Sequence, residues 1–144
     1  SGGDWTWEFW WRPSAGATLG VGQGLRGPGN ATIDLSLNDF TNTLSLVMRD
    51  INEVLVLDTG DVAATFTTGA QHHIVAMKTG TAFSTYVEGT RITNSLGITA
   101  DVPFFRVVYT SPNAPNHIDE HRVSQVARYS GASFTVPTAA FTVD

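Results

Sequence analysis

Nine residues near the start of the chain, from Asp4 to Arg12, alternate between two kinds of side chain with a period of two. One face of this segment carries only large aromatic residues, which are Trp5, Trp7, Phe9 and Trp11. The opposite face carries Thr6, Glu8, Trp10 and Arg12. Successive side chains of a β-strand point to opposite faces, so the pattern predicts a half-buried strand that ends at Pro13.

The same alternation returns in short segments along the rest of the chain. These segments are 32–37, 44–48, 54–57, 62–67, 73–77, 83–87, 104–109 and 118–124. The 19 threonines favour such strands, because a β-branched side chain fits a pleated surface. Residues 79–81 predict a hairpin turn, residues 111–116 a loop, and residues 124–128 one helical turn capped by Ser124. Roughly ten short strands without an amphipathic helix predict an all-β fold, an antiparallel two-sheet β-sandwich.

The 144 residues are interpreted as a single domain, because no linker, charge block or repeat divides them. The glycine-rich stretch 20–29 lacks the lysine and following helix of a phosphate-binding loop, and it predicts a strand end that runs into a turn.

A net charge of −5 with scattered arginines excludes a basic surface for nucleic acid. No apolar run approaches the ~20 residues of a membrane helix, so no membrane partner is expected. The absence of cysteine excludes disulfides and thiolate chemistry.

Three sequence blocks resemble those of a known superfamily, in the order in which that superfamily has them. Residues 5–13, WTWEFWWRP, are similar to the F-T-I-E-F-W-x-R-P strand of the concanavalin A-like lectin/glucanase superfamily, in its laminin-G-like branch. Residues 72–77 with 86–92 resemble its W-H-H-I-A-V … L-Y-V-D-G hairpin. Residues 118–129 resemble its closing I-D-E-x-R-I-S … A-R-Y signature, and the ending, 127–141, is similar to modules of bacteriophage structural proteins. The resemblance implies a concanavalin A-like jelly roll.

Two features depart from the family pattern. Gln71 stands where the family usually has tryptophan, so the entry to the following strand loses a large core anchor. Family domains also begin with a further strand before the first block. We therefore expect residues 1–144 to form one laminin-G-like domain that lacks the usual first strand. The sheet edge left unpaired by that loss is expected to be covered by Phe141–Val143 or by another chain.

The arrangement of acidic residues argues against catalysis. Glycosidases of the retaining type need two carboxyl groups about 5–5.5 Å apart, and the enzyme branch of the superfamily resembles E-x-D-x-x-E or E-x-D-x-E. The four glutamates of this chain are Glu8, Glu53, Glu88 and Glu120, and none is followed by an aspartate two residues later. Asp119 and Glu120 are adjacent and would point to opposite faces of a strand. We therefore expect no enzymatic activity and no catalytic residues.

The histidines do not predict a transition-metal site. His72 and His73 are neighbours, so a strand would place them on opposite faces, and His117 and His121 would be about 13 Å apart. Asp119 is the candidate metal ligand, because an aspartate in the closing strand of the resembled superfamily helps to bind a structural Ca²⁺. The alternative is that Asp119 hydrogen-bonds nearby backbone and holds the strand end. No other cofactor is expected.

Sugar recognition uses aromatic faces that stack on sugar rings, together with amides and carboxylates that bridge sugar hydroxyls. Trp10 and Tyr86 lie opposite the apolar face of their strands, and Tyr109, Asn113 and Asn116 lie where such sandwiches place a binding rim. These five residues are the candidate ligand contacts. The alternative for Trp10 is that it packs under a long loop or against a neighbouring protein, and the same alternative applies to Tyr86.

The sequence therefore predicts a non-catalytic recognition module for surface glycans or cell-envelope polysaccharide, located on a phage virion or outside the cell. The alternative is a structural virion protein that decorates a capsid or tail through contacts with other virion proteins or identical chains. An open groove lined by an aromatic, an amide and a carboxylate would favour the glycan. A large aromatic patch that meets another chain around Trp10 would favour assembly.

Overall fold

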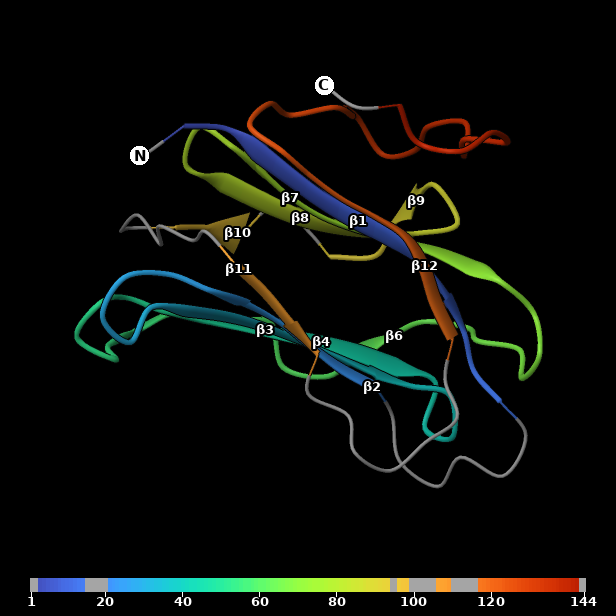
Figure 1. Cartoon of the computed structure of the whole chain (residues 1–144), viewed down its shortest axis with the longest axis horizontal. Coiled ribbons are helices and arrows are strands. Elements are labelled where there is room, and N and C mark those ends of the chain that lie inside the picture. The colour runs from blue at the N-terminus through green and yellow to red at the C-terminus, as the bar shows by residue number, and fades with distance from the viewer. Residues whose placement is uncertain (1–2, 15–20, 94–95, 99–105, 110–116, 143–144) are drawn as a thin grey trace.

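The computed structural model describes residues 3–14, 21–93, 96–98, 106–109 and 117–142. Over these residues the chain forms two antiparallel sheets that lie face to face, which confirms the predicted all-β sandwich (Figure 1). In this described part of the chain no helix is long and apolar enough to cross a membrane.

Each sheet has five strands in one continuous order and a sixth, short strand beside it. Sheet A has the order β10 (Leu96–Gly97), β8 (Ala82–Val87), β7 (His72–Thr79), β1 (Trp5–Arg12) and β12 (His117–Ser124), and β9 (Thr90–Arg91) pairs with β8. Sheet B has the order β11 (Arg106–Tyr109), β2 (Val21–Arg26), β3 (Thr32–Asn38), β4 (Thr43–Arg49) and β5 (Leu55–Asp58), and β6 (Val62–Ala63) pairs with β4. The strand with the aromatic face, β1, therefore lies between two strands that follow it much later in the chain.

The core between the sheets follows the period-two pattern of the sequence. Trp7, Phe9 and Trp11 of β1 are fully buried, and Trp5 is nearly so. From sheet B the residues that face them are Ile33, Leu35, Leu37, Leu44, Leu46 and Met48. The predicted inward face of each of these strands is confirmed.

Three segments differ from the sequence prediction. Residues 21–26 form the full strand β2, paired with β3 on one side and β11 on the other, where the glycine-rich stretch predicts only a strand end that runs into a turn. A Cβ at Gly24 would lie 2.8 Å from the guanidinium of Arg26, which forms an ion pair with Asp34 of β3. Segment 62–67 forms only the short β6, and residues 124–128 bend without forming a helical turn. The predicted loop 111–116 lies outside the described residues.

His121 of β12 is partly buried and packs against core residues of β1. Its ring stacks on Phe9 with the ring centroids 5.4 Å apart, and its Nε2 accepts a hydrogen bond from Trp7 Nε1 at 3.0 Å. Burial lowers the pKa of His121 to about 4, because the charged imidazolium would lose its water. The folded protein therefore keeps this histidine neutral where the unfolded chain would already be protonated.

This difference in protonation predicts how stability depends on pH. The pKa of His121 is lower in the folded protein than in the unfolded chain. The stability that its neutral imidazole contributes is therefore fully present above about pH 6.5, and it is lost as the pH falls towards the folded pKa. Chemical denaturation measured between these limits should give a free energy of unfolding that falls with decreasing pH. His121→Gln should flatten the curve in this window, because glutamine still accepts from Trp7. His117→Gln, at an exposed histidine of the same strand, is the matched control and should leave the slope unchanged. Equal slopes for all three proteins would contradict the prediction.

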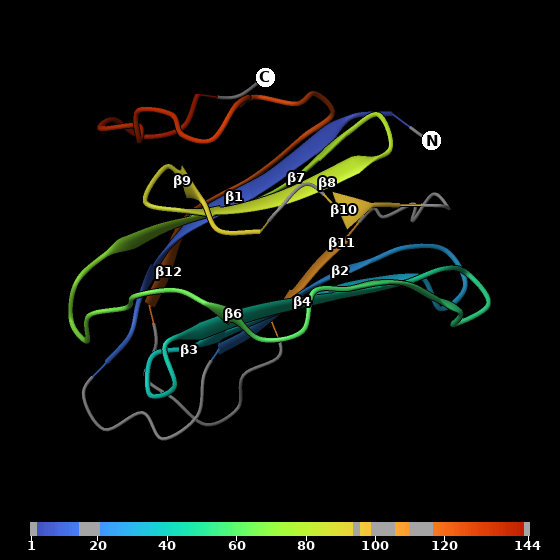
Figure 2. The same ribbon diagram turned by 180° about the vertical axis from the view of Figure 1, so that it is seen from behind.

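The outer face of sheet A is also covered. After β12 the chain crosses this face as residues 125–142, which have no regular strand or helix and are called the C-terminal strap below (Figures 1 and 2). A second, smaller core lies under the strap and consists of Val75, Met77 and Tyr86 from the sheet with Ala127, Tyr129 and Phe134 from the strap. The polar side of β1 is buried here as well, so the prediction of a half-buried strand is wrong for Thr6 and Glu8, both 0% exposed.

The strap covers a face of sheet A rather than its edge. Among the described residues β12 has one strand neighbour, β1. At the far end of the strap the Phe141 N–H donates to the side-chain carboxylate of Glu120 at 2.7 Å. The described part of Phe141–Val143 thus packs on the sheet and adds no strand to it. That another chain covers this edge stays a prediction.

Candidate functional site

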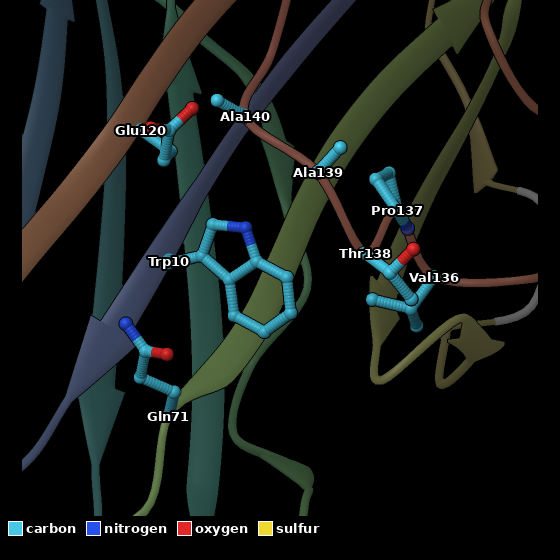
Figure 3. Close-up of a pocket in the computed structure, with 8 residues that line it drawn as sticks. All are labelled: Trp10, Gln71, Glu120, Val136, Pro137, Thr138, Ala139 and Ala140. Atoms are coloured by element: carbon cyan, nitrogen blue, oxygen red, sulfur yellow. The ribbon is translucent and has the colours of Figure 1, made fainter.

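An open pocket of about 340 Å³ lies on the outer face of sheet A, and the indole of Trp10 stands in its centre. Gln71, the residue before β7, and Glu120 of β12 lie on one side of the ring (Figure 3). The strap forms the opposite wall with Val136, Pro137, Thr138, Ala139 and Ala140. Strands β1 and β12, the residue before β7 and the strap therefore contribute to one site.

A β-bulge in β12 brings Glu120 to this pocket. The register of β1 against β12 shifts at this point, because Glu8 lies opposite Arg122 while Trp10 lies opposite Asp119. Within the bulge Glu120 has a φ of 51°, a left-handed conformation that residues other than glycine seldom adopt. The Asp119 carboxylate accepts the Glu120 N–H at 2.9 Å and stabilises this turn of the backbone. Asp119 and Glu120 thus both lie on the Trp10 side of the strand, and the expectation of opposite faces is wrong here.

The strap wall is held at both of its ends. At one end Phe134 stacks on Tyr129 with the ring centroids 3.7 Å apart, and its N–H donates to the Gly89 carbonyl at 2.9 Å. Gly89 has a φ of 72°, and a Cβ there would lie 2.3 Å from the Phe134 oxygen, so only glycine allows this approach. At the other end the hydrogen bond from Phe141 to Glu120 ties the strap to the bulge. The wall is therefore positioned by the sheet beneath it.

A buried ionic cluster lies under the strap, beside the pocket. The carboxylate of Glu8 accepts hydrogen bonds from Arg122 Nε at 2.9 Å and Arg122 Nη2 at 2.6 Å. Its other oxygen accepts from the Tyr129 hydroxyl at 2.7 Å and lies 3.1 Å from His73 Nε2. The His73 ring in turn lies 5.1 Å from the ring of Trp10. The cluster links β1, β7, β12 and the strap directly beside the Trp10 pocket.

The protonation states within the cluster follow from these contacts. Burial by itself raises the pKa of the Glu8 carboxyl, but hydrogen bonds from His73, Tyr129 and Arg122 outweigh it and hold the pKa below its usual value. Burial and the neighbouring Glu8 carboxylate raise the pKa of the Tyr129 hydroxyl. Glu8 is therefore charged and Tyr129 neutral at physiological pH.

Of the five predicted ligand contacts, the structure brings Trp10 to the pocket. It does not bring Tyr86 there, because that side chain is 1% exposed under the strap. The Tyr86 ring packs on Phe134 at 5.3 Å, and its hydroxyl donates to the Gly131 carbonyl at 3.1 Å. The prediction of Tyr86 as a ligand contact is wrong, since the strap occupies the face on which a ligand would lie.

The structure places the backbone of one of the three remaining predicted contacts. Tyr109 pairs with Gln23 in sheet B, the other sheet of the sandwich. Asn113 and Asn116 lie outside the described residues.

Asp119, the predicted metal ligand, is exposed, and one of its oxygens accepts the backbone N–H of the bulge. The described residues contain no group of three or more acidic, histidine or cysteine side chains that could hold a metal ion. The contact that the structure shows for Asp119 is thus the strand-end hydrogen bond, and a Ca²⁺ role for this residue stays a prediction.

Gln71, Glu120 and Thr138 are pocket residues that the sequence did not predict as ligand contacts. Gln71 had a signal, because it stands where the resembled family has tryptophan. Glu120 depends on the bulge and Thr138 on the path of the strap, and neither follows from a residue pattern.

Comparison with known proteins was made by sequence and by structure. The sequence matches no family model and no curated protein. Among solved structures, the carbohydrate-binding module CBM66 from Bacillus subtilis matches with a TM-score of 0.62 and 10% identity, over 84% of this chain and 74% of that one. The galectin LEC-6 of Caenorhabditis elegans matches with a TM-score of 0.63 and 12% identity, over 85% and 82%. The binding domain of Paraclostridial Mosquitocidal Protein 1 matches with a TM-score of 0.58 and 20% identity, over 88% and 35%.

These likenesses establish the fold at low sequence identity. The chain has the β-sandwich of carbohydrate-binding modules, galectins and toxin binding domains. The closer resemblance to laminin-G-like and bacteriophage modules stays a prediction.

Proposed function

We propose that the chain is a non-catalytic glycan-binding module that holds a surface glycan or cell-envelope polysaccharide on the face of Trp10. The pocket is the observation that carries this proposal, because it combines an indole with an amide and a carboxylate. An aromatic platform with a few convergent polar groups is the usual composition of a small-ligand site. The fold shared with a carbohydrate-binding module and a galectin supports it.

The proposal assigns the module to binding rather than hydrolysis. Glycoside hydrolysis uses a pair of carboxyl groups on either side of the scissile bond. Among the described residues that line the pocket Glu120 is the one acidic side chain, and one of its oxygens is engaged by the Phe141 N–H. A location on a virion or outside the cell, where such glycans are met, is part of the proposal.

Trp10→Ala should weaken glycan binding at least about 30-fold, because truncating a central aromatic anchor costs about 2 kcal/mol or more. The measurement is a glycan array with the folded domain, followed by calorimetric titration of the best ligand. The matched control is Phe40→Ala, which removes an aromatic that is 82% exposed in the β3–β4 hairpin. Phe40→Ala should bind as the unchanged protein does.

The array is run in Ca²⁺ and again in EDTA, and equal binding in both is expected because the described residues group no three acidic, histidine or cysteine side chains around Asp119. Binding that survives Trp10→Ala in a folded protein would contradict the site. Absence of binding to any glycan would contradict the function.

The structural virion protein is the second candidate, and one observation favours it. Ile51, Val54 and Leu55 are 50%, 59% and 51% exposed and lie together at the β4–β5 turn. Apolar side chains gathered on a surface are typical of a protein–protein contact. A folded domain that binds no glycan but associates with itself or with virion proteins would favour this candidate.

A further inference from the structure

The charge of the Trp10 pocket narrows the class of sugar that it can take. Of its eight lining residues the one with a charged side chain is Glu120, and the other polar groups are the Gln71 amide and the Thr138 hydroxyl. Asp119 adds a second carboxylate on the same side of the sheet, directly across from Trp10. The pocket is therefore negative around an aromatic ring.

The Glu120 carboxylate is positioned and has acceptor capacity left for a ligand. Its Oε2 accepts the Phe141 N–H at 2.7 Å, which fixes the side chain against the strap. Its Oε1 has no hydrogen-bond partner among the described residues. The bulge holds Glu120 in a left-handed backbone conformation, a strained arrangement that is found most often at ligand-binding and catalytic positions. A ligand that donates to Oε1 would meet a fixed acceptor.

Two arginines lie on the same strands, and neither lines the pocket. The Arg122 guanidinium is bound by buried Glu8 and lies 4.2 Å from the centre of the Phe141 ring. Arg12 is exposed at the end of β1, where it pairs with His117. No positively charged side chain among the residues that line the pocket therefore neutralises the carboxylate beside Trp10.

A cation over an indole face is attracted by the ring and, at this site, also by the carboxylate beside it. An acidic sugar would instead meet Glu120 and Asp119 as like charges. From this geometry we infer that the Trp10 pocket takes a hexosamine residue with a free ammonium group, whose ring stacks on Trp10 and whose ammonium binds Glu120. The inference rests on the proposed function and names the sugar class of that same site.

The test compares three β-1,4-linked tetrasaccharides that differ at one substituent: those of glucosamine, N-acetylglucosamine and glucose. Calorimetric titrations at about pH 6, where the free amine is protonated, measure each dissociation constant. The glucosamine tetramer should bind about tenfold more tightly than the other two, because only its ammonium adds an ion pair with the Glu120 carboxylate. The advantage should shrink at high salt, because exposed charge pairs are screened.

Glu120→Gln isolates the charge. Glutamine can still accept the Phe141 N–H, so the strap stays in place while the carboxylate is lost. The variant should bind all three tetramers alike, at the weaker level. Glu53→Gln, at an exposed turn away from the pocket, is the control and should keep the tenfold preference.

The outcomes separate this inference from the proposed function. Equal binding of the three tetramers by the unchanged protein overturns the ammonium inference and leaves glycan binding standing. A preference for glucosamine that survives Glu120→Gln also overturns it. Binding of none of the three overturns it too, and the array with Trp10→Ala then decides the proposed function alone.

Discussion

Glu8→Gln is expected to lower the free energy of unfolding by about 3–5 kcal/mol, the range found when one partner of a buried ion pair is removed. Glutamine has almost the same shape, so the loss comes from charge. Arg122, whose side chain is 13% exposed, would keep its charge without the carboxylate that accepts two of its hydrogen bonds. Denaturant unfolding followed by tryptophan fluorescence measures the change.

The control for this prediction is Glu53→Gln, which removes an exposed carboxylate and should change stability by about 0.5 kcal/mol or less. Because the pKa of Glu8 is low, the same unfolding experiment is also made as a function of pH. Because the folded pKa is below the unfolded one, the contribution of Glu8 is present above about pH 4.3 and is lost as the pH falls through the folded value. A variant within about 1 kcal/mol of the unchanged protein at neutral pH would show that the cluster contributes little net stability.

Trp7→Ala is expected to destabilise the protein by about 3–5 kcal/mol, as truncation of a fully buried aromatic does. The Trp7 side chain is 0% exposed, and its ring lies 5.7 Å from Phe9 and 5.9 Å from His121. The truncation also leaves partly buried His121 without the N–H that it accepts, which adds to the cavity. Thermal and denaturant unfolding should both report the loss.

Trp10→Ala is compared with Trp7→Ala to distinguish a tryptophan of the pocket from one of the core. Both residues are tryptophans on β1, but Trp10 is half-exposed and faces the pocket. Its truncation should cost well under half as much stability while removing glycan binding. Equal destabilisation by the two substitutions would show that Trp10 is a core residue, and its assignment to a binding surface would be wrong.

The sandwich follows from the sequence because burial between two sheets imposes a period of two on every strand that takes part. The predicted segments 32–37, 44–48 and 83–87 therefore agree with β3, β4 and β8 to within a residue or two. The sequence predicted β2 only as a strand end, since Gly22 and Gly24 have low strand propensity and the pairing with β11 depends on residues far along the chain.

The site was predicted only at Trp10, for two physical reasons. First, alternation tells which side chains leave the core, and it does not tell what covers them afterwards. Tyr86 and Glu8 both lie on the outer face as the pattern implies, yet the strap buries them. Second, a bulge adds one residue to one strand and reverses the alternation beyond it. Glu120 reaches the pocket through such a bulge, so its place could be found only from the pairing of β12 with β1.

The strap makes ligand binding depend on how much of the chain has been synthesised. Two hydrogen bonds join β1 to the strap. One runs from Thr6 to Val126, which is 120 positions later in the chain, and the other joins Glu8 to Tyr129, which is 121 positions later. While the ribosome is still adding residues, Trp10 has emerged but its facing wall has not. The pocket forms only after residues 136–140 are released, and contacts of such long sequence separation form late and slowly. A nascent chain would therefore contain Trp10 long before the pocket around it is complete.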